Sequence, residues 1–254
     1  MDREFTTAAL DRPAYPLQLS GFDVIAEIKD RSPAEGELAD MATTKAARAR
    51  QYADGGAAAI SVLTEPDRFD GNLDHLAEVV AAVSDKQLPV MRKDFLVDPV
   101  QILEAKAAGA SGVLLIAAML DDRSLASMLD CAFEHDLFVL LESFDSLDLE
   151  RSAHILQSVK IRKQAERNKF LIGVNARDLR TLTVDPVRLQ RFASSMPGGV
   201  VSVAESGQRD AADAAAVAEW GYGMALVGTA LMTAKDPARL IAAMIAAGRG
   251  KGLS

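Results

Sequence analysis

The stretch Val24–Gly36 reads Val-Ile-Ala-Glu-Ile-Lys-Asp-Arg-Ser-Pro-Ala-Glu-Gly, an apolar run that carries an acid at Glu27 and a base at Lys29. Side chains two residues apart on a strand point to the same face, so these two charges would share one face. Burying two charges is costly unless they pair or meet a charged ligand. The run stops at Arg31, Ser32 and Pro33, a turn signal. The stretch therefore predicts a buried strand that ends at an active site.

Seven more short apolar runs follow, and an amphipathic stretch comes after each strand. Runs this rich in Val, Ile and Leu are typical of parallel strands that are covered on both faces. The expected strands are 24–29, 58–63, 89–93, 112–117, 137–142, 170–175, 200–205 and 223–228. The expected helices are 42–54, 72–84, 98–108, 121–135, 146–166, 186–195, 208–220 and 236–248.

Eight strand–helix units in one chain of 254 residues favour an α/β fold of the (β/α)8 TIM barrel type, in a single domain. The expected boundaries are a short N-terminal segment at 1–23 and a catalytic barrel at 24–254. A doubly wound open sheet is the competing fold. It usually has fewer strands, and no Gly-x-Gly-x-x-Gly motif follows the first expected strand here.

The composition narrows the possible partners. A formal net charge of −8 argues against a nucleic-acid surface, so an anionic substrate would need a local basic pocket. Cys131 is the only cysteine, which suits a reducing compartment. No apolar run reaches the roughly 18 residues of a membrane span, and the N-terminus lacks the order of a signal peptide. We therefore expect a cytoplasmic protein with no membrane or nucleic-acid partner.

Charged and polar side chains gather at the expected carboxyl ends of the strands, where barrels of this type carry their chemistry. They are Glu27, Lys29, Lys93, Glu142, Asn175, Arg177 and Glu205. Glu142 would share one face with the apolar Phe138 and Leu140. Burial there raises the pKa of a carboxyl group, whereas a cation from Lys29 or Lys93 would lower it. Acid–base catalysis commonly uses groups tuned in this way.

The last two strand ends suit a phosphate group. Ser206 and Gly207 precede one amphipathic stretch, and Gly228 and Thr229 precede a short helical piece. Backbone N–H groups at such turns can point at an anion, and barrels often bind phosphate at these two loops. Ser32 and Lys29, on the neighbouring first strand, could complete the site.

The polar residues at the strand ends also have simpler, purely structural interpretations. Any single charged residue at a strand end can simply be exposed to solvent at the rim of the barrel. Five such residues, all at carboxyl ends of strands, are less easily explained in this way. Arg92 alternates to the helix-facing side and is expected to be structural. The three histidines lie in helical stretches without metal-ligand spacing and away from strand ends, which argues against a zinc site and against a Ser-His-Asp triad.

Seven motifs occur in a fixed order between Val24 and Pro237. They are Ile-Ala-Glu-Ile-Lys-x-x-Ser-Pro, Ile-Ser-Val-Leu-Thr-Glu with Phe-Asp-Gly at 69–71, Arg-Lys-Asp-Phe, Gly-Ala-x-x-Val-Leu-Leu-Ile, Asn-x-Arg-Asp-Leu, Ala-Glu-Ser-Gly and Leu-Val-Gly-x-x-Leu-Met. Together they resemble the indole-3-glycerol-phosphate synthase family. The resemblance implies a barrel enzyme of tryptophan biosynthesis that acts on 1-(2-carboxyphenylamino)-1-deoxyribulose 5-phosphate. It closes the indole ring with loss of CO2 and water, and needs no metal or organic cofactor.

The resemblance also implies roles for individual residues. Lys93 resembles the general acid that assists attack of the aromatic ring on the C2′ carbonyl, and Glu142 resembles the acid–base partner of the later dehydration. How Lys93 and Lys29 divide the acid role stays open. Glu27 and Asn175 match positions that hold the lysines and the substrate hydroxyls, and Arg177 matches a substrate contact. The implied phosphate site is formed by Ser32, Gly207, Gly228 and Thr229, with Glu205 and Ser206 flanking it. Phe95 and Leu115 match the pocket for the aromatic ring.

Two departures from the family pattern leave alternatives open. The segment before Glu27 is shorter than usual, which suggests an active site with less cover. The segment His154–Asn168 is surplus, and a lengthened, solvated fifth helix explains it most simply, with a partner or oligomer surface as the alternative. A paralogue acting on a modified anthranilate, or a non-catalytic sugar-phosphate binder, are the competing functions. Phosphoribosylanthranilate isomerase is rejected as a function, because its sequence pattern requires a cysteine at the position of Glu27 and an aspartate at the position of Asn175.

Overall fold

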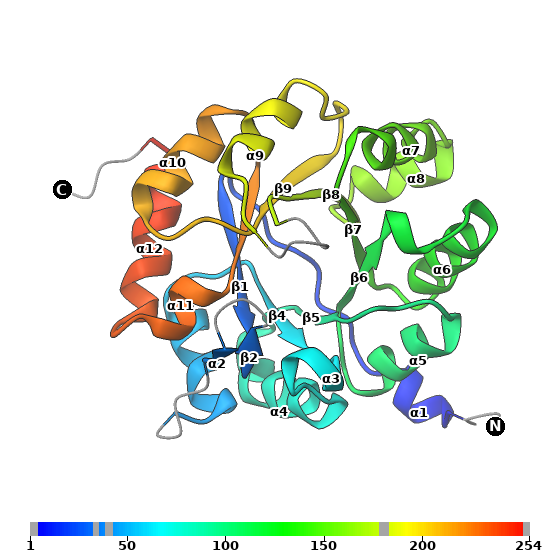
Figure 1. The fold of residues 1–254 in the computed structure, drawn as a ribbon. Helices are drawn as coiled ribbons and strands as arrows, with labels where there is room; N and C mark the ends of the chain where they lie inside the picture. The colour runs from blue at the N-terminus through cyan, green and yellow to red at the C-terminus, as the bar shows by residue number, and fades with distance from the viewer. Residues whose placement is uncertain (1–4, 33–35, 39–42, 178–182, 251–254) are drawn as a thin grey trace.

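A computed structural model describes residues 5–32, 36–38, 43–177 and 183–250. Eight parallel strands close into a barrel in the order β1-β10-β9-β8-β7-β6-β5-β4, and helices surround it (Figure 1). The barrel strands are β1 (Asp23–Ile28), β4 (Ala59–Leu63), β5 (Val90–Lys93), β6 (Gly112–Ile116), β7 (Phe138–Ser143), β8 (Phe170–Asn175), β9 (Val201–Glu205) and β10 (Met224–Val227). The predicted (β/α)8 barrel is confirmed, and each expected strand bound lies within one residue of the observed one.

Side-chain caps define where most of the helices begin. Thr44, Asn72, Asp121, Asp145 and Asp210 each accept a hydrogen bond from a backbone N–H of the first turn, the usual way to satisfy donors that lack a helical partner. The helices are α1 (Thr7–Leu10), α2 (Lys45–Asp54), α3 (Pro66–Phe69), α4 (Leu73–Val83), η1 (Ser84–Lys86), α5 (Pro99–Ala107), η2 (Ala117–Met119), α6 (Asp122–Glu134), α7 (Ser146–Leu156), α8 (Val159–Ala165), α9 (Pro186–Ala193), α10 (Ala211–Glu219), α11 (Thr229–Thr233) and α12 (Pro237–Gly248).

The first strand is followed by a small hairpin that the sequence did not indicate. Arg31 and Ser32 form β2 (Arg31–Ser32), which pairs antiparallel with β3 (Gly36–Glu37). Pro33, part of the expected turn, lies outside the described residues, as does the start of the helix expected at 42–54. The hairpin keeps Ser32 buried beside the barrel mouth.

The expected helix 146–166 is in fact two helices, α7 and α8, so this expectation is corrected. Ser158 between them has an extended backbone, with φ −61° and ψ 128°. The buried positions explain the break, because Leu156 and Ile161 are five residues apart and a straight helix of period 3.6 cannot bury both on one face. Most of the surplus segment is exposed, but Ile161 and Ala165 pack into the core, so it is a second, partly buried helix rather than an extension of the first.

Two hydrophobic cores follow from the alternation of side chains along the strands. On β6, Val113 and Leu115 belong to the core between the strands and the helices, whereas Leu114 and Ile116 belong to the core inside the barrel. Both faces of each strand are thus apolar, as expected for a sheet covered by helices on the outside and by itself on the inside.

The amino-terminal end of the barrel is closed by the chain before β1. Leu17 is buried in the interior core, and the backbone N–H of Tyr15 donates to Ser111 Oγ over 3.0 Å. Arg249, at the end of α12, donates to the Phe22 carbonyl and pairs with Asp23. The opposite, carboxyl end of the strands is left for chemistry. None of the helices within the described ranges has the length and apolar character that a membrane crossing requires.

Candidate active site

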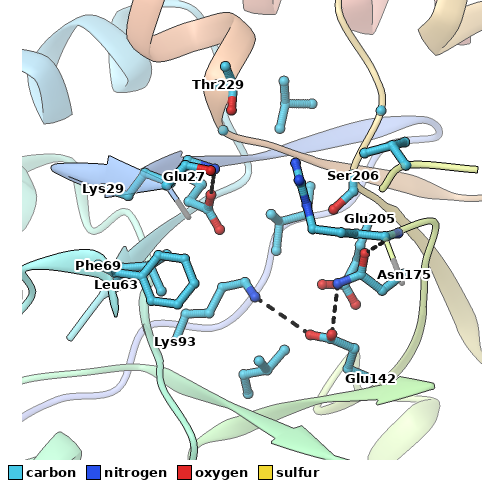
Figure 2. Close-up of a pocket in the computed structure, with 18 of the residues that line it drawn as sticks. Glu27, Lys29, Leu63, Phe69, Lys93, Glu142, Asn175, Glu205, Ser206 and Thr229 are labelled. Carbon is cyan, nitrogen blue, oxygen red and sulfur yellow. Dashed lines mark hydrogen bonds and ion pairs between the residues drawn. The ribbon is translucent and has the colours of Figure 1, made fainter. Parts of the chain in front are cut away.

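A cavity of about 690 Å³ opens at the carboxyl ends of the strands (Figure 2). All the side chains expected at the site line it except Leu115. They are Glu27, Lys29, Ser32, Lys93, Phe95, Glu142, Asn175, Arg177, Glu205, Ser206, Gly207, Gly228 and Thr229. The barrel thus brings together residues that are up to 200 positions apart in the sequence, because parallel strands converge at one end.

Glu27 and Lys29 form the pair expected from their spacing. Their side chains lie on the same face of the first strand and its continuation, with Lys29 Nζ 2.8 Å from Glu27 Oε1. Burial by itself raises the pKa of Glu27, but Lys29 and Lys93 outweigh it and the pKa is lowered. Glu27 is therefore an ionised carboxylate that pairs with Lys29 and interacts electrostatically with Lys93.

Lys93 and Glu142 face each other at the base of the cavity. Lys93 Nζ lies 3.6 Å from Glu142 Oε2, and Asn175 Nδ2 donates to Glu142 Oε1 over 2.8 Å (Figure 2). The Arg177 backbone N–H donates to Asn175 Oδ1 over 2.8 Å, which fixes the orientation of the amide. The carboxylate is thereby held by a cation on one oxygen and an amide donor on the other.

Three carboxyl groups set the charge state of Lys93. Burial by itself lowers the pKa of the lysine, but the fields of Glu142, Glu27 and Glu205 more than offset this and raise the pKa. Lys93 is thus a protonated ammonium group across the neutral range. It can donate a proton to an oxygen that gains negative charge in the cavity.

Glu205, which directly precedes the turn at Ser206, also belongs to this cluster. Its side chain is buried, and burial together with the adjacent Glu142 raises its pKa well above the ordinary value. The neighbouring strand supplies Gly173, where any Cβ would overlap Glu205 Oε1. Glycine at this position therefore makes the room for a neutral carboxyl group inside the barrel.

The other end of the cavity has the backbone geometry expected for an anion. Ser206 and Gly207 both have left-handed backbones, with φ 67° and 97°. Gly228, which precedes α11, lies so close to the first strand that a Cβ would come within 2.9 Å of Lys29 Nζ. Turns with no side chain in the way let backbone N–H groups approach a phosphate group.

The aromatic-ring pocket needs one correction. Leu115 faces the helices and is fully buried in the outer core, so it cannot line the cavity. Leu114 and Ile116 line it instead, and Ile116 is the register partner of Glu142 on β7. The sequence of β6 gave no sign of this, because a wholly apolar strand does not reveal which face points inward.

Several further lining residues were not predicted as site residues. They include Leu63, Arg68, Phe69 and Gln208. Leu63 and Phe69 lie on the side of the cavity next to Lys93 (Figure 2). The Arg68 guanidinium lies over the Phe95 ring, 5.8 Å from its centre. The signals available in the sequence were the motif Ile-Ser-Val-Leu-Thr-Glu, which contains Leu63, and the Phe-Asp-Gly motif that begins at Phe69.

Arg92 has the structural role expected from its alternation. Its guanidinium donates to Thr64, to Asp94 and to the Gln101 carbonyl, and it pairs with Glu104 of α5. Thr64 Oγ1 in turn donates to Asp94 over 2.6 Å. This network fixes the strand end that carries Lys93.

Buried polar atoms without a hydrogen-bond partner concentrate at the cavity. Among the described residues they are Glu142 Oε2, both carboxyl oxygens of Glu205, Gln208 Oε1 and Ser61 Oγ, and all but the last belong to residues that line it. Such atoms are rare in folded proteins and call for a specific explanation. A polar ligand bound here would supply the missing partners.

Fold and site together define a (β/α)8-barrel protein with a lysine–carboxylate cluster and an anion-binding turn at one mouth. The chain belongs to the indole-3-glycerol phosphate synthase family, whose sequence model matches residues 17–244. The indole-3-glycerol phosphate synthase of Mycobacteroides abscessus is 43% identical over 232 residues, which cover 91% of this chain and 79% of the relative. That of Mycobacterium leprae is 44% identical over 241 residues, covering 95% and 82%.

Solved structures agree on the fold. The 3-hexulose-6-phosphate synthase of Salmonella typhimurium superposes with a TM-score of 0.66 at 15% identity, covering 89% of this chain and 97% of that one. A chain of tryptophan synthase from M. tuberculosis gives a TM-score of 0.60 at 18% identity, covering 90% and 93%. At these identities the likeness shows a common barrel architecture and nothing about the reaction.

Proposed function

We propose that this protein is a carbon–carbon lyase that converts 1-(2-carboxyphenylamino)-1-deoxyribulose 5-phosphate to indole-3-glycerol phosphate, with loss of CO2 and water, in tryptophan biosynthesis. Family membership over residues 17–244 supports the reaction. The observation that carries it at the level of chemistry is the pair of Lys93 and Glu142, 3.6 Å apart at the base of the cavity.

Lys93 is the general acid of ring closure in this proposal. When the aromatic ring attacks the C2′ carbonyl, the carbonyl oxygen becomes a hydroxyl group and needs a proton. Lys93 is a protonated ammonium group in the neutral range and can supply this proton. The bond from the ring to the carboxylate carbon then breaks, CO2 leaves, and its electron pair restores the aromatic ring. Lys29, paired with Glu27, is a second cation that lies beside Gly228 toward the phosphate end of the cavity and stabilises negative charge on the substrate.

Glu142 is the acid–base partner of the dehydration. The new hydroxyl group must leave as water while a proton is removed from the adjacent C1′ carbon, so that the double bond of the indole forms. A carboxylate with one oxygen held by Asn175 and the other near Lys93 can take one proton and help return another. Asn175 and Glu27 orient these groups and remain available to the substrate hydroxyls.

The two ends of the cavity match the two ends of the substrate. Leu114, Ile116 and Phe95 form an apolar wall for the aromatic ring. The turn at Ser206 and Gly207, the start of α11 at Gly228 and Thr229, and Ser32 form the phosphate end. Arg177 belongs to the wall between them and provides a further cation for the substrate.

One experiment tests the proposal directly. Purified protein is incubated with the carboxyphenylamino-deoxyribulose phosphate, and the appearance of indole fluorescence is followed, with and without EDTA. We expect turnover that EDTA does not change, and the same turnover in Lys160→Ala, which removes an exposed lysine of α8. Absence of product, or activity that EDTA abolishes and a divalent ion restores, would refute the proposal.

A further inference from the structure

Gln208 is a buried glutamine in the connection between β9 and α10 that the proposed chemistry does not use. Its side chain is 6% exposed, whereas Gly207 and Arg209 on either side are exposed. The side chain lines the phosphate end of the active-site cavity. A polar side chain buried at such a place needs hydrogen-bond partners for both ends of its amide.

The donor end of the amide has a partner within the same turn. Gln208 Nε2 donates to the Ser206 carbonyl over 2.9 Å. Because a carbonyl oxygen only accepts, the amide must present its nitrogen to Ser206 and its oxygen to the opposite side. The orientation of the side chain is therefore fixed by chemistry.

This hydrogen bond controls the turn through the rigid peptide plane. The carbonyl of Ser206 and the N–H of Gly207 belong to one peptide unit and point in opposite directions. Holding the carbonyl against Gln208 thus aims the Gly207 N–H away from Gln208. Ser206 has φ 67°, a conformation that non-glycine residues adopt only when their surroundings enforce it.

The backbone N–H groups of this turn are a further feature of the phosphate end. Within the described ranges, the N–H groups of Ser206, Gly207 and Gln208 donate to no backbone carbonyl. Three consecutive N–H groups without a backbone acceptor, at the edge of a cavity, are suited to binding an anion.

The acceptor end of the amide also lacks a partner. Gln208 Oε1 is buried and receives no hydrogen bond in the described part of the chain. An orphaned acceptor takes only a donor, and a sugar phosphate carries hydroxyl donors next to its phosphate group. A polyol phosphate therefore matches both halves of the turn, with the phosphate group on the N–H groups and a hydroxyl group on Oε1.

We propose that Gln208 is a positioning residue for phosphate, which aims the Gly207 N–H through its bond to Ser206, and that its Oε1 accepts a hydrogen bond from a substrate hydroxyl group. The identity of the substrate rests on the proposed function. The positioning of the turn does not, because it concerns binding of the phosphate group alone.

The test replaces the amide while keeping the length of the side chain. In Gln208→Met, binding of inorganic phosphate, measured by calorimetry at 20 °C, should weaken about tenfold, the scale of one lost hydrogen bond. Binding of sn-glycerol 3-phosphate should weaken further, because the hydroxyl contact is lost as well. KM should rise while kcat stays within about twofold, since Lys93 and Glu142 are untouched.

Two further variants make the test decisive. Gln190→Met, on the exposed face of α9, is the matched control and should bind both ligands as the unmodified protein does. Gln208→Glu keeps an acceptor but loses the donor to Ser206, and should bind phosphate worst, because its carboxylate also repels the anion. Calorimetry at 20 °C measures the folded protein, so a modest loss of stability does not obscure the result.

The outcomes separate cleanly. Unchanged phosphate affinity in Gln208→Met overturns the positioning role, and so does a loss confined to glycerol phosphate. A fall in kcat equal to the rise in KM also overturns it, since the effect would then not be limited to the phosphate end. If the unmodified protein shows no turnover but its phosphate binding depends on Gln208, the proposed reaction fails and the positioning role stands.

Discussion

At the scale of single residues, the cavity presents a problem of charge balance. The cations Lys29, Lys93 and Arg177 line it together with the three carboxyl groups of Glu27, Glu142 and Glu205. Burial and the adjacent Glu142 raise the pKa of Glu205, so Glu205 is the acid that keeps its proton. Coupled groups of this kind are frequent at active sites, where opposite pKa shifts separate acids from bases.

Lys93→Ala should lower kcat by about 10²-fold or more, the usual scale for one general acid. The reason is that Lys93 is the protonated group that faces Glu142 at the base of the cavity. The circular dichroism spectrum should stay native, because the substitution lies at the barrel mouth. Steady-state kinetics beside Lys160→Ala would check this. A Lys93→Ala enzyme as active as the unmodified one would assign the acid role to Lys29.

Glu205→Gln should stabilise the fold at neutral pH. A carboxyl group with a raised pKa keeps its proton in the folded state above pH 4.5, whereas the unfolded chain releases it, so stability is lost as pH rises toward the folded pKa. Glutamine has no such penalty. The free energy of unfolding of Glu205→Gln at pH 7 should therefore exceed that of the unmodified protein.

Denaturant unfolding at two pH values would check the Glu205 prediction. The stability difference between Glu205→Gln and the unmodified protein should shrink as the pH is lowered toward 4.5, the ordinary value of the carboxyl group. Glu219→Gln, on the exposed face of α10, is the control and should show no such trend. A difference that does not depend on pH would contradict a protonated Glu205.

At the scale of elements, β6 shows how one strand serves two cores. Leu115 packs against the helices, and its neighbours Leu114 and Ile116 pack inside the barrel. The register pairs Ile116 with Glu142, so the apolar wall of the cavity and the Glu142 carboxyl group stand side by side on neighbouring strands. A substitution at Leu115 therefore affects the packing of the scaffold, whereas a substitution at the adjacent Leu114 or Ile116 affects the cavity.

Leu115→Ala should cost about 2–5 kcal/mol of the free energy of unfolding and leave KM unchanged, because it opens a cavity in the outer core only. Ile116→Ala should also destabilise, but it should raise KM as well by removing part of the wall for the aromatic ring. Denaturant unfolding and steady-state kinetics on both variants would check the contrast. A raised KM in Leu115→Ala alone would show that the assignment of faces is inverted.

At the scale of the whole molecule, the barrel is closed at the amino-terminal ends of its strands and open at their carboxyl ends. Leu17 and the chain before β1 close the amino-terminal end, and Arg249 ties the last helix to the start of β1. The Asp23 side chain is only 4% exposed and pairs with this arginine. A buried carboxylate held by one cation is strongly destabilised when that cation is removed.

Arg249→Met should therefore destabilise the protein by about 3–5 kcal/mol, the scale for breaking a buried pair. The double variant Arg249→Met with Asp23→Asn should recover much of this loss, because no uncompensated charge remains buried. Urea unfolding of both single variants and the double variant gives the coupling energy. Additive effects would show that the pair does not act as a unit. Arg239→Met, on the same helix but outside the pair, serves as the control.

The sequence by itself determined the number and order of the strand–helix units, and the pairing of Glu27 with Lys29. It did so because the side-chain alternation of a strand is a local property of the backbone, and charges within an apolar run reveal the face. Most of the residues expected at the cavity were found in the same way, because they follow the carboxyl ends of recognisable strands.

Only the tertiary structure decided which side chains from distant parts of the sequence lie side by side inside the barrel. Closure and stagger of the barrel set which residues of neighbouring strands stand side by side, and these are not local quantities. They place Glu205 against Glu142, and they turn Leu114 and Ile116 inward instead of Leu115 on a strand that is apolar on both faces. The break between α7 and α8 and the hydrogen bond of Gln208 to its own turn likewise depend on what packs against them, so the local pattern could not reveal them.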